Sequence, residues 1–341
     1  MNNMHITLNN KFLTYILSAV LFIFPVHLVF IFLKNLLYDS EIFKAKKVDA
    51  KVVSIGNIAL GGTGKTPTTI AIANFLERKG YSVGIVTRGH GRKNIKNSFL
   101  LKNHSWKECG DEVVLLKNNT SSSTLIFVSL DKVYAAEQLS SMGCNIILLD
   151  DGFQHRRIHR DIDIVLLGPE NQNKKLQFVY PYGLLREPFS YLKRADITIA
   201  TKSNLVKSTN FTSDHSLNLE VKEEVLSSGS VKNINELGSQ SGILSVCSIG
   251  DPDSFSKTLN SINISVDKRL VFPDHWPFNL NDIEKINDLT SKENLKHIVC
   301  TEKDFVKLVE FKNALDIDIC AVVMKHQLSE EIEQDILSRL A

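Results

Sequence analysis

Neither a strong charge of one sign nor a paired-cysteine pattern occurs in this sequence. Its 341 residues carry 40 Lys and Arg against 38 Asp and Glu, so the net charge of +2 indicates no nucleic-acid partner. The five cysteines are odd in number, widely spaced and without a Cys-x-x-Cys pair, so neither a disulfide framework nor a zinc site is indicated. This cysteine usage fits a reducing compartment. No internal repeat is visible, and 43% apolar with 23% charged residues is an ordinary globular composition.

Charge is also missing from a long stretch near the N-terminus. Phe12–Leu33 holds 22 residues without a formal charge, and about 20 apolar residues suffice for a bilayer-spanning helix. Pro25 and His27 interrupt the stretch, so a kinked span, an interfacial helix in one leaflet and a buried core helix all remain open. No small-residue cleavage site follows, so we expect no removed signal peptide.

Lysines flank this stretch mainly on its C-terminal side. They are Lys11 before it and Lys34, Lys44, Lys46 and Lys47 after it. Loops rich in Lys and Arg stay in the cytoplasm, so the sequence predicts that the body of the chain lies on the cytoplasmic side of a membrane.

Apolar β-branched runs alternate with helical patterns over the rest of the chain. In the first series, strands are expected at Lys51–Ile55, Val83–Thr87, Leu125–Val128, Asn145–Asp150, Asp163–Leu167 and Ile197–Thr201, and helices at Thr66–Lys79, Gly110–Lys117 and Lys132–Met142. In the second series, the expected elements are Gly242–Ser248, Pro252–Leu259, Arg269–Phe272, Leu280–Leu289, His297–Thr301, Lys303–Phe311, Asp316–Val323 and Ser329–Leu340. Nearly continuous apolar strands predict a mainly parallel sheet covered on both faces.

We therefore predict an α/β fold in three parts. Residues 1–38 form an N-terminal membrane-associated helix, residues 39–170 a phosphate-loop core, and residues 171–341 a smaller α/β domain with its linker. The length leaves room for two such domains. The polar stretch Asn204–Ser241 is expected to hold loops and an edge strand.

A glycine-rich run directly follows the first apolar strand. Its residues are Ala59, Leu60, Gly61, Gly62, Thr63, Gly64, Lys65 and Thr66. Glycines let the backbone point its N–H groups at phosphate oxygens, while Lys65 reaches the β and γ phosphates and Thr66 can ligate Mg²⁺. Ala59 stands where the strict pattern has Gly, and the alternative is a strand-to-helix turn with no ligand. We predict that this run binds a nucleotide.

Acidic residues and one histidine stand at the ends of other predicted elements. Asp150 and Asp151 end an apolar strand, where phosphate-loop enzymes place a Mg²⁺ ligand; the alternative is a solvated turn. Asp111 and Glu112 open a helix, where they either complement the helix dipole or supply a general base and a group near the metal. His275, beside an Asp and between two prolines, is either structural or able to polarise a catalytic carboxylate.

Basic residues gather after two of the predicted strands. One cluster is Arg88-Gly89-His90-Gly91-Arg92-Lys93, and the other is His155-Arg156-Arg157 with His159 and Arg160. Arginine can grip phosphate through two parallel hydrogen bonds, and the position at strand ends favours anion binding over a solvated loop. The residues we assign to substrate binding are Arg88, Arg92, His155 and the later Arg186.

Taken together, these motifs resemble the tetraacyldisaccharide 4'-kinase family, the lipid A 4'-kinases of Gram-negative bacteria. The matching runs are Ser54-Ile55-Gly56-Asn57, Gly61-Gly62-Thr63-Gly64-Lys65-Thr66-Pro67, Thr87-Arg88-Gly89-His90-Gly91-Arg92, Gly110-Asp111-Glu112, Asp150-Asp151-Gly152-Phe153-Gln154-His155, Leu185-Arg186-Glu187-Pro188, Phe272-Pro273-Asp274-His275 and Thr301-Glu302-Lys303-Asp304. They follow the family's order from about residue 40 to 310, and the ordered set is far more specific than the loop alone. Two positions depart from the family's pattern. Val113 stands where family members often carry Pro after Gly-Asp-Glu, and His90 stands where an aromatic residue is usual in the Arg-Gly-x-Gly-Arg stretch.

The resemblance implies ATP-dependent phosphorylation of the 4'-hydroxyl of a tetraacyl glucosamine disaccharide 1-phosphate, a step of lipid A biosynthesis. It also implies a second domain that closes over the nucleotide, with Asp111 as the base, His275 coupled to it, and Asp150 and Asp151 serving Mg²⁺ or the closed state. The predicted catalytic residues are Asp111, His275 and Lys65, and the predicted metal ligands are Thr66, Asp150, Asp151 and Glu112. We expect a monomer on the cytoplasmic face of the bacterial inner membrane, with a glycolipid substrate and no nucleic acid.

Three other classes compete with this interpretation. Partitioning-type ATPases share a Gly-Gly-x-Gly-Lys-Thr loop but carry a Lys where Leu60 stands. GTPase switches need Asn-Lys-x-Asp, and in Thr301-Glu302-Lys303-Asp304 the Lys comes one place late. A membrane-tethered module without catalysis would leave Asp111 and His275 dispensable. Nucleotide turnover that depends on a lipid acceptor separates all three from the kinase.

Overall fold

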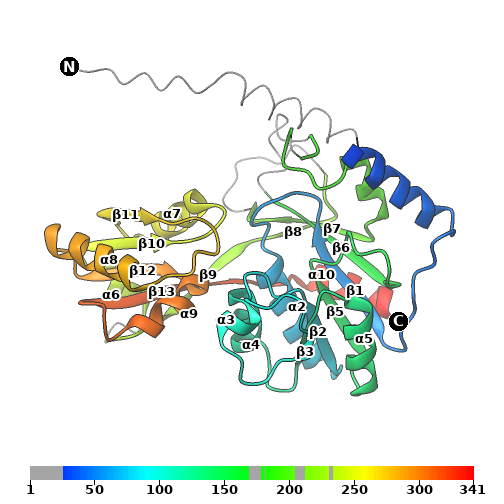
Figure 1. The fold of residues 1–341 in the computed structure, drawn as a ribbon, viewed down its shortest axis with the longest axis horizontal. Helices are drawn as coiled ribbons and strands as arrows, with labels where there is room; N and C mark the ends of the chain where they lie inside the picture. The colour runs from blue at the N-terminus through cyan, green and yellow to red at the C-terminus, as the bar shows by residue number, and fades with distance from the viewer. Residues whose placement is uncertain (1–25, 169–177, 181, 204–211, 230–232) are drawn as a thin grey trace.

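The protein folds into two α/β units, each built on its own sheet (Figure 1). The structure is a computed structural model, and it describes residues 26–168, 178–180, 182–203, 212–229 and 233–341. Both sheets are mostly parallel, which confirms the predicted α/β class.

The first unit contains an eight-stranded sheet within the described residues. Its strands are β1 (Lys51–Asn57), β2 (Val83–Thr87), β3 (Phe99–Leu100), β4 (Leu125–Val128), β5 (Ile146–Asp150), β6 (Ile162–Leu167), β7 (Ile197–Thr201) and β8 (His215–Leu217). Their order is β3-β4-β2-β5-β1-β6-β7-β8, and only β3 pairs antiparallel. The six strands predicted here are all present, because each is a short apolar run bounded by polar or turn residues.

Helices cover both faces of this sheet, as the apolar strands predicted. They are α2 (Lys65–Arg78), α3 (Trp106–Cys109), α4 (Asp111–Asn119), α5 (Lys132–Ser141), η3 (Phe189–Arg194) and α10 (Glu330–Leu340). Val53 and Ile55 of β1 share an apolar core with α2, α4 and α10, while Val52 packs with α5 on the opposite face. Alternate residues of one strand thus enter different cores, which is the period of a β-strand.

The second unit holds a five-stranded sheet in the order β11-β10-β12-β13-β9. Its strands are β9 (Leu219–Ser227), β10 (Ile243–Cys247), β11 (Lys268–Val271), β12 (His297–Thr301) and β13 (Asp318–His326), and its helices are α6 (Ile234–Gly238), α7 (Pro252–Ser261), α8 (Leu280–Lys292), α9 (Glu302–Leu308) and η5 (Val309–Phe311). One face packs against α8 and α9, and the other against α6 and α7. This unit is therefore also a three-layer sandwich with its own core.

The boundary between the units lies further along the chain than the predicted residue 170. β7 and β8 extend the first sheet to residue 217, and the second sheet begins with β9. The final helix, α10, returns to the first unit, where Ile332, Ile336 and Leu340 join the core. An apolar strand pattern does not say which sheet the strand joins, so the predicted ranges 39–170 and 171–341 divide the chain differently from the two sheets.

The antiparallel pair of β9 and β13 connects the units. β9 leads from the first unit into the second sheet, and β13 runs in the opposite direction, back toward the first unit (Figure 1). At the end of β13, His326 Nδ1 lies 2.8 Å from Thr68 Oγ1 of α2. The helix that begins at the phosphate loop is therefore in direct contact with the connection.

An N-terminal helix over residues 26–39 packs against the first unit. Ile31 joins an apolar cluster with Phe153, while Phe30 remains 66% exposed. Among the residues described, no helix is both long enough and apolar enough to cross a membrane. Most of the predicted stretch Phe12–Leu33 lies outside the described residues, so the membrane helix included in the fold prediction is not supported by the structure.

Candidate active site

A cleft of about 1060 Å³ lies between the two units. Its lining from the first unit includes the phosphate loop, residues 60–67, and the strand ends at residues 87–88 and 150–151. From the second unit, Asp274, His275 and Lys303 face the same space. The cleft lies at the carboxyl edge of the first sheet, which is where open α/β sheets bind ligands.

The phosphate loop joins β1 to α2 through glycines in left-handed backbone. The φ angle is 118° at Gly61 and 83° at Gly64, values that glycine adopts without a Cβ penalty. Thr63 is held from two sides, since Asn57 Nδ2 donates to its hydroxyl at 2.9 Å and Thr201 Oγ1 donates to its carbonyl oxygen at 2.8 Å. No described side chain caps the start of α2, so its first N–H groups remain available to an anion.

The first two residues of the predicted loop have different positions. Leu60 lines the cleft, whereas Ala59 is buried behind the loop in a bridge to Leu185. The Leu60 N–H also donates to the carbonyl oxygen of Leu184 at 2.6 Å. The departure from Gly at position 59 therefore falls where the backbone is extended and a methyl group fits.

Asp150 ends β5 inside the cleft and is almost fully buried. Thr87 Oγ1 donates to Asp150 Oδ2 at 3.0 Å, while Asp150 Oδ1 has no hydrogen-bond partner among the described residues. Burial raises the pKa of Asp150 to about 6, and the nearby carboxylate of Glu112 acts in the same direction. A buried carboxylate oxygen without a donor is costly, so this atom fits a role as a cation ligand.

Asp151 is a paired carboxylate in a strained backbone. Arg186 Nη1 lies 2.8 Å from both of its carboxylate oxygens, and Lys65 Nζ lies 3.8 Å from Oδ1. Burial opposes ionisation, but Lys65, Arg186 and Lys132 lower the pKa of Asp151 to about 2. Its φ of 53° is uncommon for a residue with a Cβ. The Lys132 ammonium donates to the main-chain oxygens of both Asp150 and Asp151, and these bonds fix the backbone at the end of β5.

The four predicted metal ligands, Thr66, Glu112, Asp150 and Asp151, all line the cleft. Within the described part of the chain, no group of three or more His, Cys, Asp or Glu side chains is arranged to hold a metal ion. Asp150 Oδ1 fits a cation, but the protein ligands are too few for a complete site. Mg²⁺ would need oxygens from a bound phosphate and from water, which is its usual arrangement in kinases.

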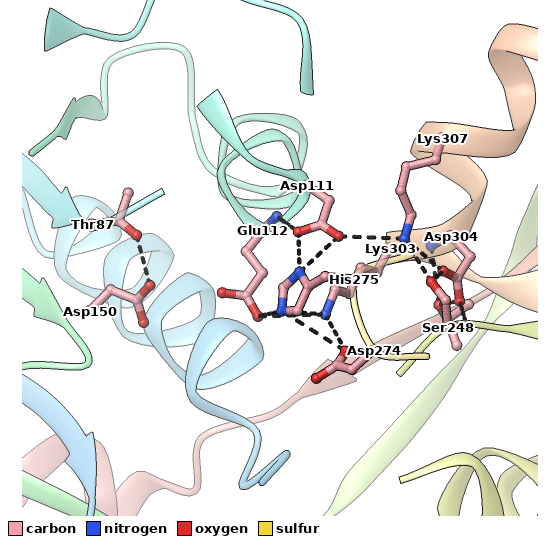
Figure 2. A network of polar contacts seen from close by, with 11 residues as sticks. Thr87, Asp111, Glu112, Asp150, Ser248, Asp274, His275, Lys303, Asp304 and Lys307 are labelled. Carbon is pink, nitrogen blue, oxygen red and sulfur yellow. Dashed lines mark hydrogen bonds and ion pairs between the residues drawn. The ribbon is translucent and has the colours of Figure 1, made fainter. Parts of the chain in front are cut away.

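His275 lines the cleft from the second unit and contacts Asp111, which is buried and is not among the lining residues, although its neighbour Glu112 is (Figure 2). His275 Nδ1 lies 3.0 Å from Asp111 Oδ1 and 3.1 Å from Oδ2, although 164 positions separate the two residues in sequence. Asp111 opens α4 directly after Gly110, which has a φ of 100° and whose Cβ, if present, would overlap the His90 carbonyl oxygen. Burial opposes ionisation of Asp111, yet the hydrogen bond from His275 and the charges of Lys303 and Lys307 keep its pKa below the usual range.

The contacts of His275 define which nitrogen carries its proton. Lys303 Nζ lies 3.0 Å from His275 Nε2 and 3.1 Å from Asp274 Oδ1. An ammonium group can only donate, so Nε2 accepts and the proton of a neutral ring sits on Nδ1, facing Asp111. His275 also has a φ of 58°, a strained conformation for a residue with a Cβ and one that is typical of functional sites.

The structure brings two of the four predicted substrate residues to the cleft. Arg88 and Arg186 line it, whereas Arg92 and His155 do not. The guanidinium of Arg92 turns back into its own loop. It donates to the carbonyl oxygen of Ile95 at 2.7 Å and to that of Asn97 at 2.6 Å. Burial, with the nearby charge of Lys132 and other cations, lowers the pKa of His155 to about 4. Arg92 is therefore engaged within its own loop, and His155 lies outside the lining of the cleft.

The sequence model of a family described as tetraacyldisaccharide-1-P 4'-kinase, LpxK, matches residues 17–341. The chain belongs to this family. A tetraacyldisaccharide 4'-kinase from Syntrophus aciditrophicus is 32% identical over 339 residues, which cover 90% of this chain and 89% of the relative. Another from Cytophaga hutchinsonii is 31% identical over 329 residues, 90% and 92% of the two chains. A crystal structure of LpxK from Aquifex aeolicus in complex with ATP covers 95% of this chain and 99% of its own, with a TM-score of 0.75 and 28% identity.

Family membership confirms the resemblance drawn from the motifs. The sequence patterns give no role to three lysines that the structure places near the site. Lys303 stands in a motif at a strand end, a position that could have indicated it. Lys307 lies four residues later on α9, so the two share a helix face. Lys132 gives no such signal, because a lysine at the first position of a helix is usually exposed.

Proposed function

We propose that this chain transfers the γ-phosphoryl group of ATP to the 4'-hydroxyl of a tetraacylated glucosamine disaccharide 1-phosphate. The observation that carries the proposal is a phosphate loop that shares one cleft with His275, which in turn contacts the buried carboxylate of Asp111, in a member of the 4'-kinase family. A nucleotide site alone would fit many proteins. A buried carboxylate held by a histidine opposite that site adds the base that a hydroxyl acceptor needs.

The nucleotide phosphates bind at the loop from Leu60 to Thr66. The uncapped N–H groups of α2 face an anion there, and Lys65 neutralises charge on the transferred group. The solved relative from Aquifex aeolicus is described in complex with ATP, which supports ATP as the donor. Mg²⁺ would be held by Asp150 and Thr66 and would neutralise phosphate charge.

Asp111 acts as the general base. Its carboxylate is ionised at neutral pH, and the Nδ1 proton of His275 orients it. It would accept the proton of the sugar hydroxyl as that oxygen forms its bond to phosphorus. Such a base contributes typically about 10²–10⁴-fold to the rate, while positioning and charge stabilisation supply the remainder. Arg88 and Arg186 line the cleft as contacts for the anionic acceptor.

The acyl chains of the acceptor stay in the inner membrane, and the first unit meets that membrane from the cytoplasmic side as a monomer. Exposed apolar side chains on residues 26–43, 178–180 and 182 support this orientation, among them Phe30, Ile42, Phe178 and Tyr180. Lys44 and Lys47 follow the first patch and would face anionic headgroups. This arrangement is interfacial, with apolar side chains entering one leaflet.

The reaction is tested by following ADP release with Mg-ATP in the presence and absence of the tetraacyl disaccharide 1-phosphate. We expect release to depend on the acceptor. ADP release at the same rate without acceptor would instead favour a regulatory ATPase. The membrane contact is tested by replacing Phe30 and Phe178 with Ser. Activity on vesicle-bound acceptor should fall further than activity on detergent-dispersed acceptor, and equal losses would contradict the contact.

A further inference from the structure

Lys307 is fully buried, yet the reaction outlined above gives it no part. Both Lys307 and its neighbour on α9, Asp304, have 0% side-chain exposure. A buried ammonium group is costly unless partners compensate for the lost water. The partners of the Lys307 ammonium must therefore compensate for its lost hydration.

Two of these contacts fix the ammonium within the second unit. Lys307 Nζ lies 2.7 Å from Ser248 Oγ and 3.1 Å from Asp304 Oδ1. Asp304 is itself held, because its Oδ2 accepts from the Ser248 N–H at 2.9 Å and from Thr301 Oγ1 at 2.8 Å. The ring of Phe278 lies 5.3 Å from the ammonium and closes another side. The ammonium is thus held by Ser248, directly after β10, and by Asp304 in the first turn of α9, rather than being free to adjust.

The remaining contact crosses between the units. Figure 2 shows Lys307 extending toward the Asp111 carboxylate, with Nζ 3.5 Å from Oδ2. Asp111 Oδ1 accepts from the Glu112 N–H at 2.9 Å, and His275 Nδ1 approaches both oxygens. Lys307 is therefore a formal positive charge placed directly against Oδ2, and it comes from the opposite unit.

We propose that Lys307 is a positioning residue for the base: from the second unit, its buried ammonium holds the Asp111 carboxylate in a fixed plane. His275 and Lys307 then secure the same carboxylate from two segments of the second unit, the β11–α8 loop and α9. The alternative is a purely structural ion pair with Asp304, one helical turn away, in which the approach to Asp111 has no consequence.

A double-mutant cycle separates these alternatives, and it rests on the proposed function. Lys307→Met removes the charge but retains an apolar chain beside Phe278. We expect kcat to fall about 10- to 100-fold, with KM for ATP and for the acceptor changed less than about twofold. In an Asp111→Asn background, Lys307→Met should change kcat by less than about twofold, because the group it acts on is already gone. The wild-type rate in the same assay tests the proposed function separately.

Two further variants control for the possibility that Lys307→Met lowers kcat only by destabilising the fold. Lys307→Met combined with Asp304→Asn leaves no unpaired buried charge and should show the same fall in kcat. Ile286→Ala destabilises the apolar core shared with Phe278 without touching Asp111, and should lower Tm while kcat is retained. Equal effects of Lys307→Met with and without Asp111, an unchanged kcat, or an equal fall in kcat for Ile286→Ala at equal Tm loss would each overturn the proposal.

Discussion

The two sides of the cleft are assembled in different ways. The phosphate loop is a run of consecutive residues between β1 and α2, and its geometry is set by glycine torsions and by contacts inside the first unit. The base centre joins Asp111 of the first unit to His275, Lys303 and Lys307 of the second. The loop side is set mainly within the first unit, with a contact from the second sheet where His326 of β13 lies against Gly64 and Thr68. The base side exists only where the two units meet. Nucleotide binding and activation of the acceptor should therefore respond separately to substitution.

The largest expected effect lies on the loop side. Lys65→Ala removes the cation that neutralises the transferred group, so we expect product formation to fall about 10³–10⁵-fold. Lys292→Ala, an exposed lysine on α8, serves as the control and should keep the wild-type rate. Initial-rate measurement at saturating ATP checks this. A loss below tenfold would show that Lys65 does not contact the reacting phosphates.

On the base side, Asp111→Asn keeps the shape of the side chain but cannot accept a proton. We expect kcat to fall about 10²–10⁴-fold while ATP affinity, measured by calorimetry, stays near wild type. His275→Ala acts through Asp111 and should cost less, about tenfold to a hundredfold. If His275→Ala were as damaging in an Asp111→Asn background as alone, the two residues would not work as a couple.

Replacing Gly64 on the loop side and Gly110 on the base side with Ala compares the two sides of the cleft directly. At Gly64 a Cβ would lie 2.6 Å from His326 Cε1, and at Gly110 it would overlap the His90 carbonyl oxygen. We expect Gly64→Ala to weaken ATP binding and Gly110→Ala to lower kcat, each with about 1–3 kcal/mol of lost stability. Gly80 has a similar φ of 88° with nothing within 4 Å, so Gly80→Ala controls for backbone strain alone. The same kinetic defect in both variants would remove the distinction between the two sides.

The smallest effect concerns α10, which joins the end of the chain to the first unit. His215 Nε2 lies 3.0 Å from Asp335 Oδ2, and Arg339 Nε lies 2.7 Å from Oδ1. Burial opposes ionisation of Asp335, but these hydrogen bonds hold its pKa below the usual range. A lowered carboxylate pKa stabilises the fold above the unfolded-state pKa, near 3.9, and that contribution disappears as the pH falls through the folded-state pKa.

Asp335→Asn should therefore lower the free energy of unfolding at pH 7 by about 0.5–1 kcal/mol, a value limited by solvent screening of the pair. Denaturant titrations at several pH values check this. The difference from wild type should shrink as the pH falls below about 4 and should disappear once Asp335 is protonated in the folded protein. A difference that persisted unchanged in acid would mean that the charge of Asp335 does not contribute to stability.

Much of the fold and one side of the site could be predicted from the sequence, because they depend on neighbours in the chain. The bounds of β2, β4 and β7 match their apolar runs, and the loop at residues 60–66 has the required glycines. The sheet to which β7 and β8 belong depends on pairing partners and could not be predicted from composition. The same is true of the return of α10.

The other side of the site was predicted through family resemblance rather than from spacing. Asp111 and His275 each had a structural alternative of comparable weight, since neither motif contains any sign of the other. Arg92 was predicted to bind substrate, because an arginine in a glycine-rich loop is a reasonable anion ligand. Its guanidinium instead donates to carbonyl oxygens of its own loop, which a local sequence pattern does not reveal. Lys307 was missed because nothing in its local sequence distinguishes a buried lysine from an exposed one.

The most direct test of the central claim is mass spectrometry of the acceptor after incubation with Mg-ATP. We expect the wild-type protein to add one phosphoryl group to the tetraacyl disaccharide 1-phosphate, and both Lys65→Ala and Asp111→Asn to form little or no product. Unmodified acceptor with the folded, ATP-bound wild-type protein would contradict the proposed reaction. Full product formation by Asp111→Asn would contradict the role of the base centre.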